Sequence, residues 1–250
     1  MNNPHEKKSA GRPEYLGDFR PEAIFTGPRQ EVSGDRFIKR RGRPTRPRWL
    51  VLFKRLRSSR ITREAKSYEA LRKIGVPCPG NIRVREERNF LGLLTSSRIS
   101  MDFIANAVDL KFICTLDSFA LIRQNRAWRR RVIRRIAGWV RHMHDHGYFD
   151  SKLHFGNILV VPDPDAFDPE IYFIDVAGGH KSFFTRKKHL QMKDIAYLYH
   201  DSLRWCAPRE RVLFMHEFLE TGKLSRDDRL FIHKIIRYAE GKFKKKKALS

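Results

Sequence analysis

The segment 147–175 places the tightest limits on what this chain can fold into. A polar loop ends at Asn157 and runs directly into the apolar stretch 158–160. A turn rich in Pro and Asp then leads to a second apolar stretch, 171–174, which ends at Asp175. Short apolar runs that are bounded by turn residues predict two β-strands joined as a hairpin. The predicted hairpin supplies an amide and a carboxylate that can hold one divalent ion between them.

This arrangement is what phosphoryl transfer of the kinase type requires. Such enzymes hold their metal ions with an Asn that leaves the catalytic loop and an Asp that ends a nearby strand. We therefore predict Asn157 and Asp175 as metal ligands. A carboxylate that closes an apolar strand is costly unless it is paired with a metal or with hydrogen bonds, which favours this interpretation. The alternative for both residues is an ordinary turn position, where Asn and Asp are common.

The charge of the chain points to polyanionic partners. Its 250 residues include 52 Lys and Arg against 28 Asp and Glu, so the formal net charge is +24. Such an excess favours nucleic acid, an anionic membrane surface or a phosphate-rich substrate. The three cysteines (Cys78, Cys114 and Cys206) are widely spaced and predict neither a disulfide framework nor a zinc site, which fits a reducing, cytoplasmic setting. No apolar run approaches the ~20 residues that span a bilayer, and the N-terminus has no apolar signal core. Any membrane contact is therefore expected to be peripheral.

The element pattern predicts an α+β fold. We expect a strand at 49–54, a helix at 61–74 and short strands within 80–113, among them 90–95 and 98–103. The second half is expected to be mainly helical around the hairpin, with helices at 116–144, 193–203, 208–219 and 226–243. The corresponding domains are a flexible segment (1–22), a β-rich N-lobe that binds nucleotide (23–113), a helical C-lobe that carries the catalytic loop and the substrate side (114–241) and a polybasic tail (242–250).

The order of these parts is that of a bilobal protein-kinase-like fold. Lys54 in the predicted strand 49–54 would reach nucleotide phosphates, and Glu64 in the following helix would pair with it and fix its position. The alternative is that Lys54 is a surface charge, because eleven Lys and Arg lie between residues 36 and 60. Five arginines of the predicted helix 116–144 are equally open to two interpretations, a solvated face or an anion-binding face. They are Arg129, Arg130, Arg131, Arg134 and Arg135.

An ordered set of motifs over residues 50–205 resembles the lipopolysaccharide kinase family (Kdo/WaaP, or InaA-type). The residues that carry the resemblance are Arg63-Glu64, 71–79 (LRKIGVPCP), 144–159 (HDHGYFDSKLHFGNIL), 172–175 (YFID) and 193–196 (KDIA). The first two look like the family's helix and its exit, and the third looks like its catalytic loop.

The resemblance implies ATP and Mg²⁺ as cofactors, and phosphorylation of a sugar hydroxyl of the lipopolysaccharide inner core at the cytoplasmic face of the inner membrane. It places Lys54 and Glu64 at the phosphates and Asn157 and Asp175 on Mg²⁺. Asp194 is placed like the Asp that braces the catalytic loop from behind. The implied partners are the lipopolysaccharide core or another anionic glycolipid and an anionic membrane surface, near which each Lys or Arg contributes about 1 kcal/mol.

One departure from the kinase pattern concerns catalysis itself. The Asp that accepts the proton of the attacking hydroxyl lies five residues before the Asn in kinase loops, and here that position is Lys152. Three interpretations follow: Asp150 supplies the carboxylate, the chain binds nucleotide without transferring phosphate, or transfer proceeds without a dedicated base. We favour Asp150 as the carboxylate near the hydroxyl, with Lys152 stabilising charge on the transferred group. No G-x-G-x-x-G motif precedes Lys54, and arginines between residues 32 and 49 are the candidates for that role.

Two functions of other kinds compete with this interpretation. A basic nucleic-acid-binding protein would use the runs 36–60 and 242–247, but no nucleic-acid-binding motif is present and the Asn157/Asp175 pair has no role in such a protein. We therefore do not expect nucleic acid as a partner. Kinases of the aminoglycoside or choline type use acidic pockets for cationic acceptors, which the positive charge of this chain disfavours.

Overall fold

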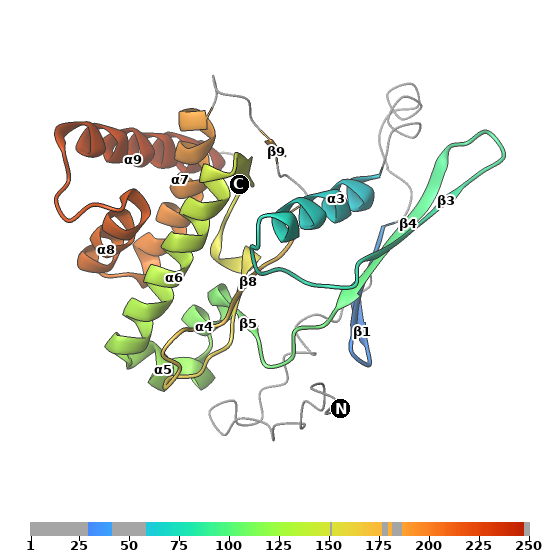
Figure 1. The fold of residues 1–250 in the computed structure, drawn as a ribbon, viewed down its shortest axis with the longest axis horizontal. Coiled ribbons are helices and arrows are strands. Elements are labelled where there is room, and N and C mark those ends of the chain that lie inside the picture. Colours follow the sequence, from blue (N-terminus) through green and yellow to red (C-terminus); the bar gives the residue numbers. More distant parts are fainter. Residues whose placement is uncertain (1–29, 42–58, 151, 177–179, 182–186, 248–250) are drawn as a thin grey trace, which may run out of the picture.

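The computed structural model describes residues 30–41, 59–150, 152–176, 180–181 and 187–247, and within them a mainly β-stranded part precedes a mainly helical part (Figure 1). The first part is an antiparallel sheet of order β1-β2-β4-β3 with one helix, α3, packed on it. Its elements are β1 (Gln30–Ser33), β2 (Arg36–Arg41), α3 (Arg60–Lys73), β3 (Arg83–Arg88) and β4 (Leu94–Asp102). The segment 1–22 and the strand predicted at 49–54, with Lys54, lie outside the described residues.

The helix predicted at 61–74 is confirmed as α3. The side chain of Ser59 caps it by accepting a hydrogen bond from the Thr62 amide at 3.0 Å, which satisfies one of the free amides at a helix start. Ile61, Tyr68 and Leu71 recur at helical spacing and are fully buried against the rest of the molecule. The helix ends before Gly75, whose φ of +75° is a backbone conformation that favours glycine. α3 is therefore anchored along one face at a fixed position over the sheet.

The strand predicted at 90–95 is wrong for residues 90–93, which form the turn of the β3–β4 hairpin, and only its last two residues belong to β4. The Asn89 side chain accepts hydrogen bonds from the amides of Leu91 at 3.1 Å and Leu93 at 2.9 Å. Gly92 adopts a φ of +69°. These local contacts outweigh the strand preference of Phe90 and its apolar neighbours. The strand predicted at 98–103 is confirmed as the second half of the longer β4, except that β4 ends at Asp102.

The helical part begins earlier than expected and is divided differently. Its helices are α4 (Leu110–Thr115), α5 (Ala120–Gln124), α6 (Arg126–Asp145), α7 (Lys187–Trp205), α8 (Pro208–Leu219) and α9 (Arg226–Lys247), with a 3₁₀ turn at Asp117–Phe119. The single helix predicted at 116–144 is wrong, because Asn125 interrupts it. The Asn125 side chain accepts a hydrogen bond from the Trp128 amide at 2.9 Å and so starts α6 afresh. Helix α9 includes residues 242–247 of the predicted polybasic tail.

Acidic side chains hold several of the arginines of α6. Arg129 makes a bidentate pair with Glu210 of α8, at 2.7 and 2.6 Å, and Arg134 pairs with Glu217 of α8 at 2.9 Å. Arg135 lies 3.0 Å from Asp168 in the turn after β7 (Ile158–Val160). These pairs tie α6 to its neighbours, so the arginines act as links between elements more than as an open anion-binding face.

The hairpin predicted from the two apolar runs is confirmed and lies between the strand part and the helices. Strand β7 pairs with β8 (Ile171–Phe173) in antiparallel register, with Ile158 opposite Phe173, and with β5 (Val108–Asp109) on its other side. A further small pair joins β6 (Tyr148–Phe149) to β9 (His180–Lys181). Ile158, Val160 and Phe173 are fully buried. The hairpin thus fixes the residues at its open end, 157 and 175, in relation to both parts of the molecule.

Candidate active site

A buried lysine links three separate elements at the open end of this hairpin. Lys39 of β2 has its Nζ 3.2 and 3.4 Å from the two carboxylate oxygens of Glu64 on α3. The same Nζ lies 2.8 Å from Oδ1 of Asp175, which follows β8. Glu64 is almost completely buried, and the Lys39 side chain is largely so. A lysine held between two carboxylates has a fixed position and a fixed charge, which are the properties that a phosphate-binding cation needs.

Burial and pairing act in opposite directions on Glu64. Burial raises the pKa of its carboxyl group, and the Lys39 ammonium opposes that rise. The pairing therefore supports the ionised form of Glu64 in a place where an isolated carboxylate would take up a proton. Removal of either partner would leave the other as a buried charge without its counter-ion.

Helix α3 also fixes the backbone of Asp175. The Asp175 amide donates a hydrogen bond to the hydroxyl oxygen of Tyr68 at 2.9 Å, and Tyr68 lies one helical turn after Glu64. Asp175 has a φ of +51°, which is uncommon for a residue with a side chain. Burial raises the pKa of the Tyr68 hydroxyl well above its usual range, so this group stays neutral. One helix thus positions both the partner of Lys39 and the candidate metal ligand.

Asn157 and Asp175 face a common cavity of about 310 Å³, whose wall also includes Lys39, Glu64 and Tyr68. The two segments are joined directly, because the Ile174 amide donates to the Asn157 carbonyl at 2.9 Å. The side-chain Nδ2 of Asn157 donates to Oδ2 of Asp150 at 3.4 Å. The side-chain Oδ1 of Asn157 therefore remains available for another partner. One amide oxygen and one carboxylate suit Mg²⁺, which uses few protein ligands and completes its shell with phosphates and water. Within the described residues no group of three or more His, Cys, Asp and Glu forms a metal cluster.

Asp150 lies behind Asn157 and is almost fully enclosed, with 4% of its surface exposed. Its amide donates to Oδ2 of Asp194 on α7 at 3.0 Å, and the same oxygen lies 3.1 Å from Nε2 of His144. Burial, followed by the nearby Asp194 carboxylate, raises the pKa of Asp150 to about 8. Lys152, in contrast, is exposed. Asp194 and His144 therefore hold the loop from behind, and Asp150 reaches the Asn157 side chain from within it.

The structure thus brings together Glu64, Asn157 and Asp175, which the sequence singles out, and adds a residue that the sequence reasoning missed. The prediction for Lys54 lies outside the described residues, and the lysine that contacts Glu64 is Lys39. A signal for it exists in the sequence. A turn at 33–35 is followed by Phe37-Ile38-Lys39, a lysine in an apolar strand segment, but many other basic residues nearby obscure it.

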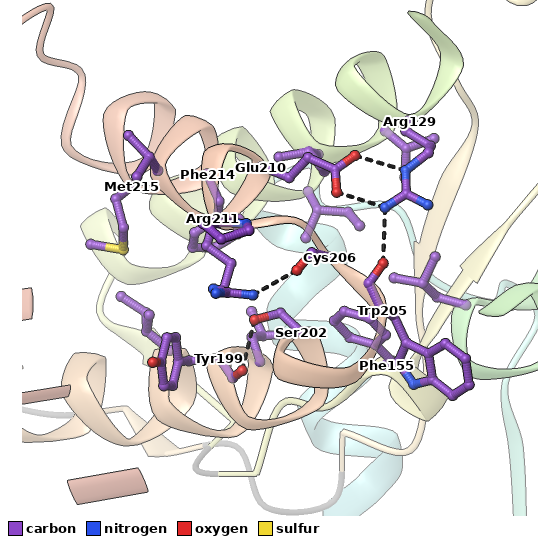
Figure 2. Close-up of a pocket in the computed structure, with 18 of the residues that line it drawn as sticks. Arg129, Phe155, Tyr199, Ser202, Trp205, Cys206, Glu210, Arg211, Phe214 and Met215 are labelled. Atoms are coloured by element: carbon purple, nitrogen blue, oxygen red, sulfur yellow. Dashed lines mark hydrogen bonds and ion pairs between the residues drawn. The ribbon is translucent and has the colours of Figure 1, made fainter. Parts of the chain in front are cut away.

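A second cavity, of about 320 Å³, lies among the helices of the other part and is lined mainly by apolar side chains (Figure 2). Phe155, Tyr199, Trp205, Phe214 and Met215 are among its lining residues. Figure 2 also shows the Arg129–Glu210 pair at this cavity. It contains none of the residues predicted for catalysis or metal binding, so the chemistry is assigned to the first cavity.

Comparisons with known proteins identify the family and the fold of the chain. A model of the lipopolysaccharide kinase (Kdo/WaaP) family matches residues 41–218. A solved structure described as WaaP in complex with acyl carrier protein has the same fold, with a TM-score of 0.58 at 17% sequence identity. That match covers 92% of this chain and 93% of the other. It confirms the predicted fold class, a small β-sheet lobe joined to a helical lobe in the kinase manner. The search of curated proteins found no match.

Proposed function

Because the chain belongs to the lipopolysaccharide kinase (Kdo/WaaP) family, we propose that it transfers the γ-phosphoryl group of ATP to a sugar hydroxyl of the lipopolysaccharide inner core. The observation that supports this most is the single cavity lined by Lys39, Glu64, Asn157 and Asp175. In the reaction the acceptor oxygen forms a bond to phosphorus, the bond from the γ-phosphorus to the bridging oxygen breaks, and the acceptor hydroxyl loses its proton.

Each residue of the cavity has a proposed role in positioning charge. Lys39, held by Glu64, would contact the phosphates of the nucleotide. Asn157 and Asp175 would hold Mg²⁺, which neutralises charge on the phosphates when it is bound. Asp175, which contacts Lys39 in this structure, would supply a carboxylate oxygen to the ion, and Glu64 would keep Lys39 in place beside the phosphates. These charges, fixed before the reaction, provide most of the catalysis expected of a loose phosphoryl-transfer transition state.

Asp150 and Lys152 are the candidates at the acceptor side. A carboxyl group with a pKa of about 8 is well matched to accept a proton near neutral pH, and Asp150 lies 3.4 Å from the Asn157 side chain. Lys152 is exposed on the same loop and would stabilise charge on the transferred group. We propose Asp150 as the proton acceptor and Asp194 as the residue that braces its backbone.

A phosphate-transfer assay with lipopolysaccharide core as acceptor tests the proposal against that of an inactive, nucleotide-binding protein. The purified chain is expected to add one phosphate group to the core, detected by mass, and Asp175→Ala is expected to abolish the transfer. Asp165→Ala is the matched control, because Asp165 is an exposed carboxylate in the turn between β7 and β8. Nucleotide binding without transfer by the wild type would favour the inactive alternative.

A peripheral position on an anionic membrane completes the proposed function. No helix in the described part of the chain has the length and apolar character needed to cross a membrane. The substrate class carries a lipid anchor, and the net charge of +24 favours an anionic surface. We propose the cytoplasmic face of the inner membrane as the place of action.

A carrier protein is a second candidate partner. The matched WaaP structure is that of a complex with acyl carrier protein. The positive charge of this chain would suit an acidic partner, and the apolar cavity of Figure 2 would accept an acyl chain. Retention of acylated but not of unacylated carrier protein by the immobilised chain is the expected result. Absence of retention for both forms would contradict this partner.

A further inference from the structure

The β3–β4 hairpin projects from the sheet, away from the helical lobe (Figure 1). Its tip carries two exposed apolar side chains. Phe90 is 95% exposed and Leu91 is 62% exposed. A single exposed apolar side chain is ordinary, but a neighbouring aromatic and aliphatic pair at the end of a projecting element is typical of an interaction site. Neither residue has a role in the proposed phosphoryl transfer.

Hydrogen bonds within the turn fix the backbone of the tip, so the exposure of these two side chains is a property of the folded turn. The Asn89 amide donates to the Leu93 carbonyl, and the Gly92 amide donates to the Asn89 carbonyl, both at 2.9 Å. The Asn89 side chain accepts two further hydrogen bonds, from backbone amides within the turn. Leu93 is buried, whereas Phe90 and Leu91 face outward. The turn therefore presents these two side chains at a fixed point.

One face of the sheet behind the tip carries a row of arginines. In the antiparallel register Arg40 of β2 lies opposite Arg98 of β4, and Arg98 lies opposite Arg85 of β3. Directly opposed residues share a face, and like charges in this position destabilise a sheet. Two acids moderate the row, since Glu31 pairs with Arg40 at 2.6 Å and Glu87 lies 3.9 Å from Arg85. Arg85, Arg98 and Arg40 nevertheless all remain exposed.

The distance between tip and row matches the layers of a bilayer. Arg85 lies three residues before the end of β3, which is about 10 Å along the strand, and Phe90 lies beyond that end in the turn. Interfacial elements bury their apolar side chains by roughly 5–10 Å at the boundary between headgroups and acyl chains. A tip inserted to that depth leaves the guanidinium groups near the lipid phosphates, which bind arginine well.

We propose that the β3–β4 hairpin anchors the protein to an anionic lipid bilayer, with Phe90 and Leu91 inserted among the lipids and the row Arg40, Arg85 and Arg98 on their phosphates. The choice of a lipid surface rests on the proposed function, which places the substrate in a membrane. Nucleic acid would bind the arginine row but would leave the apolar side chains of the tip exposed to water. A second copy of the chain would meet the same positive row, so like charges disfavour that occupant.

Co-sedimentation with vesicles of phosphatidylethanolamine and phosphatidylglycerol tests the proposal, with phosphatidylcholine vesicles as the neutral reference. The double variant F90S/L91S is expected to lose at least about tenfold in partitioning to the anionic vesicles. R85Q/R98Q is expected to lose on the order of tenfold, in a salt-dependent way. F167S is the matched control and should bind as the wild type does, because Phe167 is 93% exposed but lies in the turn after β7.

A second measurement reports on the tip alone. F90W should shift its added tryptophan emission to the blue with anionic vesicles, whereas F167W should not. Unchanged partitioning of F90S/L91S, or no shift for F90W, would overturn the proposal, and so would a dimer that F90S/L91S dissociates. Phosphate transfer to a delipidated core oligosaccharide should be equal in F90S/L91S and the wild type. Loss of vesicle binding with retained transfer therefore separates this proposal from the function itself.

Discussion

Lys39 is the residue around which the candidate site is organised. It is the described lysine that contacts Glu64 and Asp175 together, and its partners come from different elements. The sequence identifies Glu64, Asn157 and Asp175 because each stands in a distinctive local setting. It does not identify Lys39, because the choice among many nearby basic residues depends on which one the folded sheet turns toward α3. That choice is a matter of tertiary packing.

Replacement of this lysine should therefore lower activity strongly, and it should also lower stability because the buried Glu64 loses its partner. Lys39→Met is expected to lower kcat/KM for phosphate transfer on the order of 100-fold, since a fixed cation at the phosphates is lost. Lys66→Met, on the exposed face of α3, is the control and should leave activity unchanged. Steady-state kinetics of both variants, with Lys54→Met beside them, decides the matter. Loss in Lys54→Met together with full activity in Lys39→Met would assign the role to Lys54.

The raised pKa of Asp150 predicts how the rate of phosphate transfer depends on pH. With a pKa of about 8, it must lose its proton to act as a base, so the transfer rate should rise with pH and level off above about 8. Asp150→Asn should abolish turnover and keep ATP binding. The folded chain also holds this proton between about pH 4 and 8, where the unfolded chain has released it, so Asp150 costs stability as the pH rises. Asp150→Asn should therefore have a higher Tm than the wild type at pH 8.

A second carboxylate behind the same loop provides the control. Asp201 accepts a hydrogen bond from the Phe155 amide at 2.9 Å, and Asp201→Asn should keep the rise in rate between pH 6 and about 8 that is expected of the wild type. Full activity in Asp150→Asn would exclude Asp150 as the base and would favour transfer without one, by positioning and charge alone.

At the scale of elements, α3 couples the two lobes. It carries Glu64 toward the sheet and Tyr68 toward the segment after β8. Its position was predictable, because a helical apolar pattern and a terminal glycine agree with one another, whereas the cap, Ser59, is seen only in the structure. The division of the helix expected at 116–144 was not, because an interior Asn acts as a cap only when the chain bends there. The turn at Asn89–Gly92 was missed because Phe90 and Leu91 have the apolar character of strand residues, whereas the hydrogen bonds of the Asn89 side chain are seen only in the structure.

Loss of the Tyr68 hydroxyl should loosen Asp175. In Tyr68→Phe the Asp175 amide loses its acceptor, which should cost about 1 kcal/mol of stability and raise the Mg²⁺ concentration needed for half-maximal transfer by several-fold. Tyr172→Phe is the matched control, because its hydroxyl bonds only to the exposed Glu170 among the described contacts. Kinetics at varied Mg²⁺ should separate the two. An equal Mg²⁺ dependence in Tyr68→Phe and the wild type would contradict the positioning role.

At the scale of the whole molecule, two lobes of different composition meet at the cavity that holds the charged and amide groups of the candidate site. The sheet lobe supplies Lys39 and α3, and the helical lobe supplies the loop and the hairpin with Asn157 and Asp175. The order of elements along the chain was enough to predict this bilobal arrangement. The total charge was not enough to predict where charge is used, because acids hold several of the arginines of α6 and others form the row on the β-sheet.

Calorimetric titration of ATP into the purified chain, with and without Mg²⁺, tests the central claim most directly. The account predicts binding that strengthens with Mg²⁺ in the wild type and in Asp165→Ala. In Asn157→Ala and Asp175→Ala it predicts that the Kd measured with Mg²⁺ rises at least roughly tenfold, the equivalent of one lost charge-assisted contact. ATP binding that is independent of Mg²⁺, and equal in all four proteins, would contradict the claim that residues 157 and 175 hold a metal ion at the phosphates.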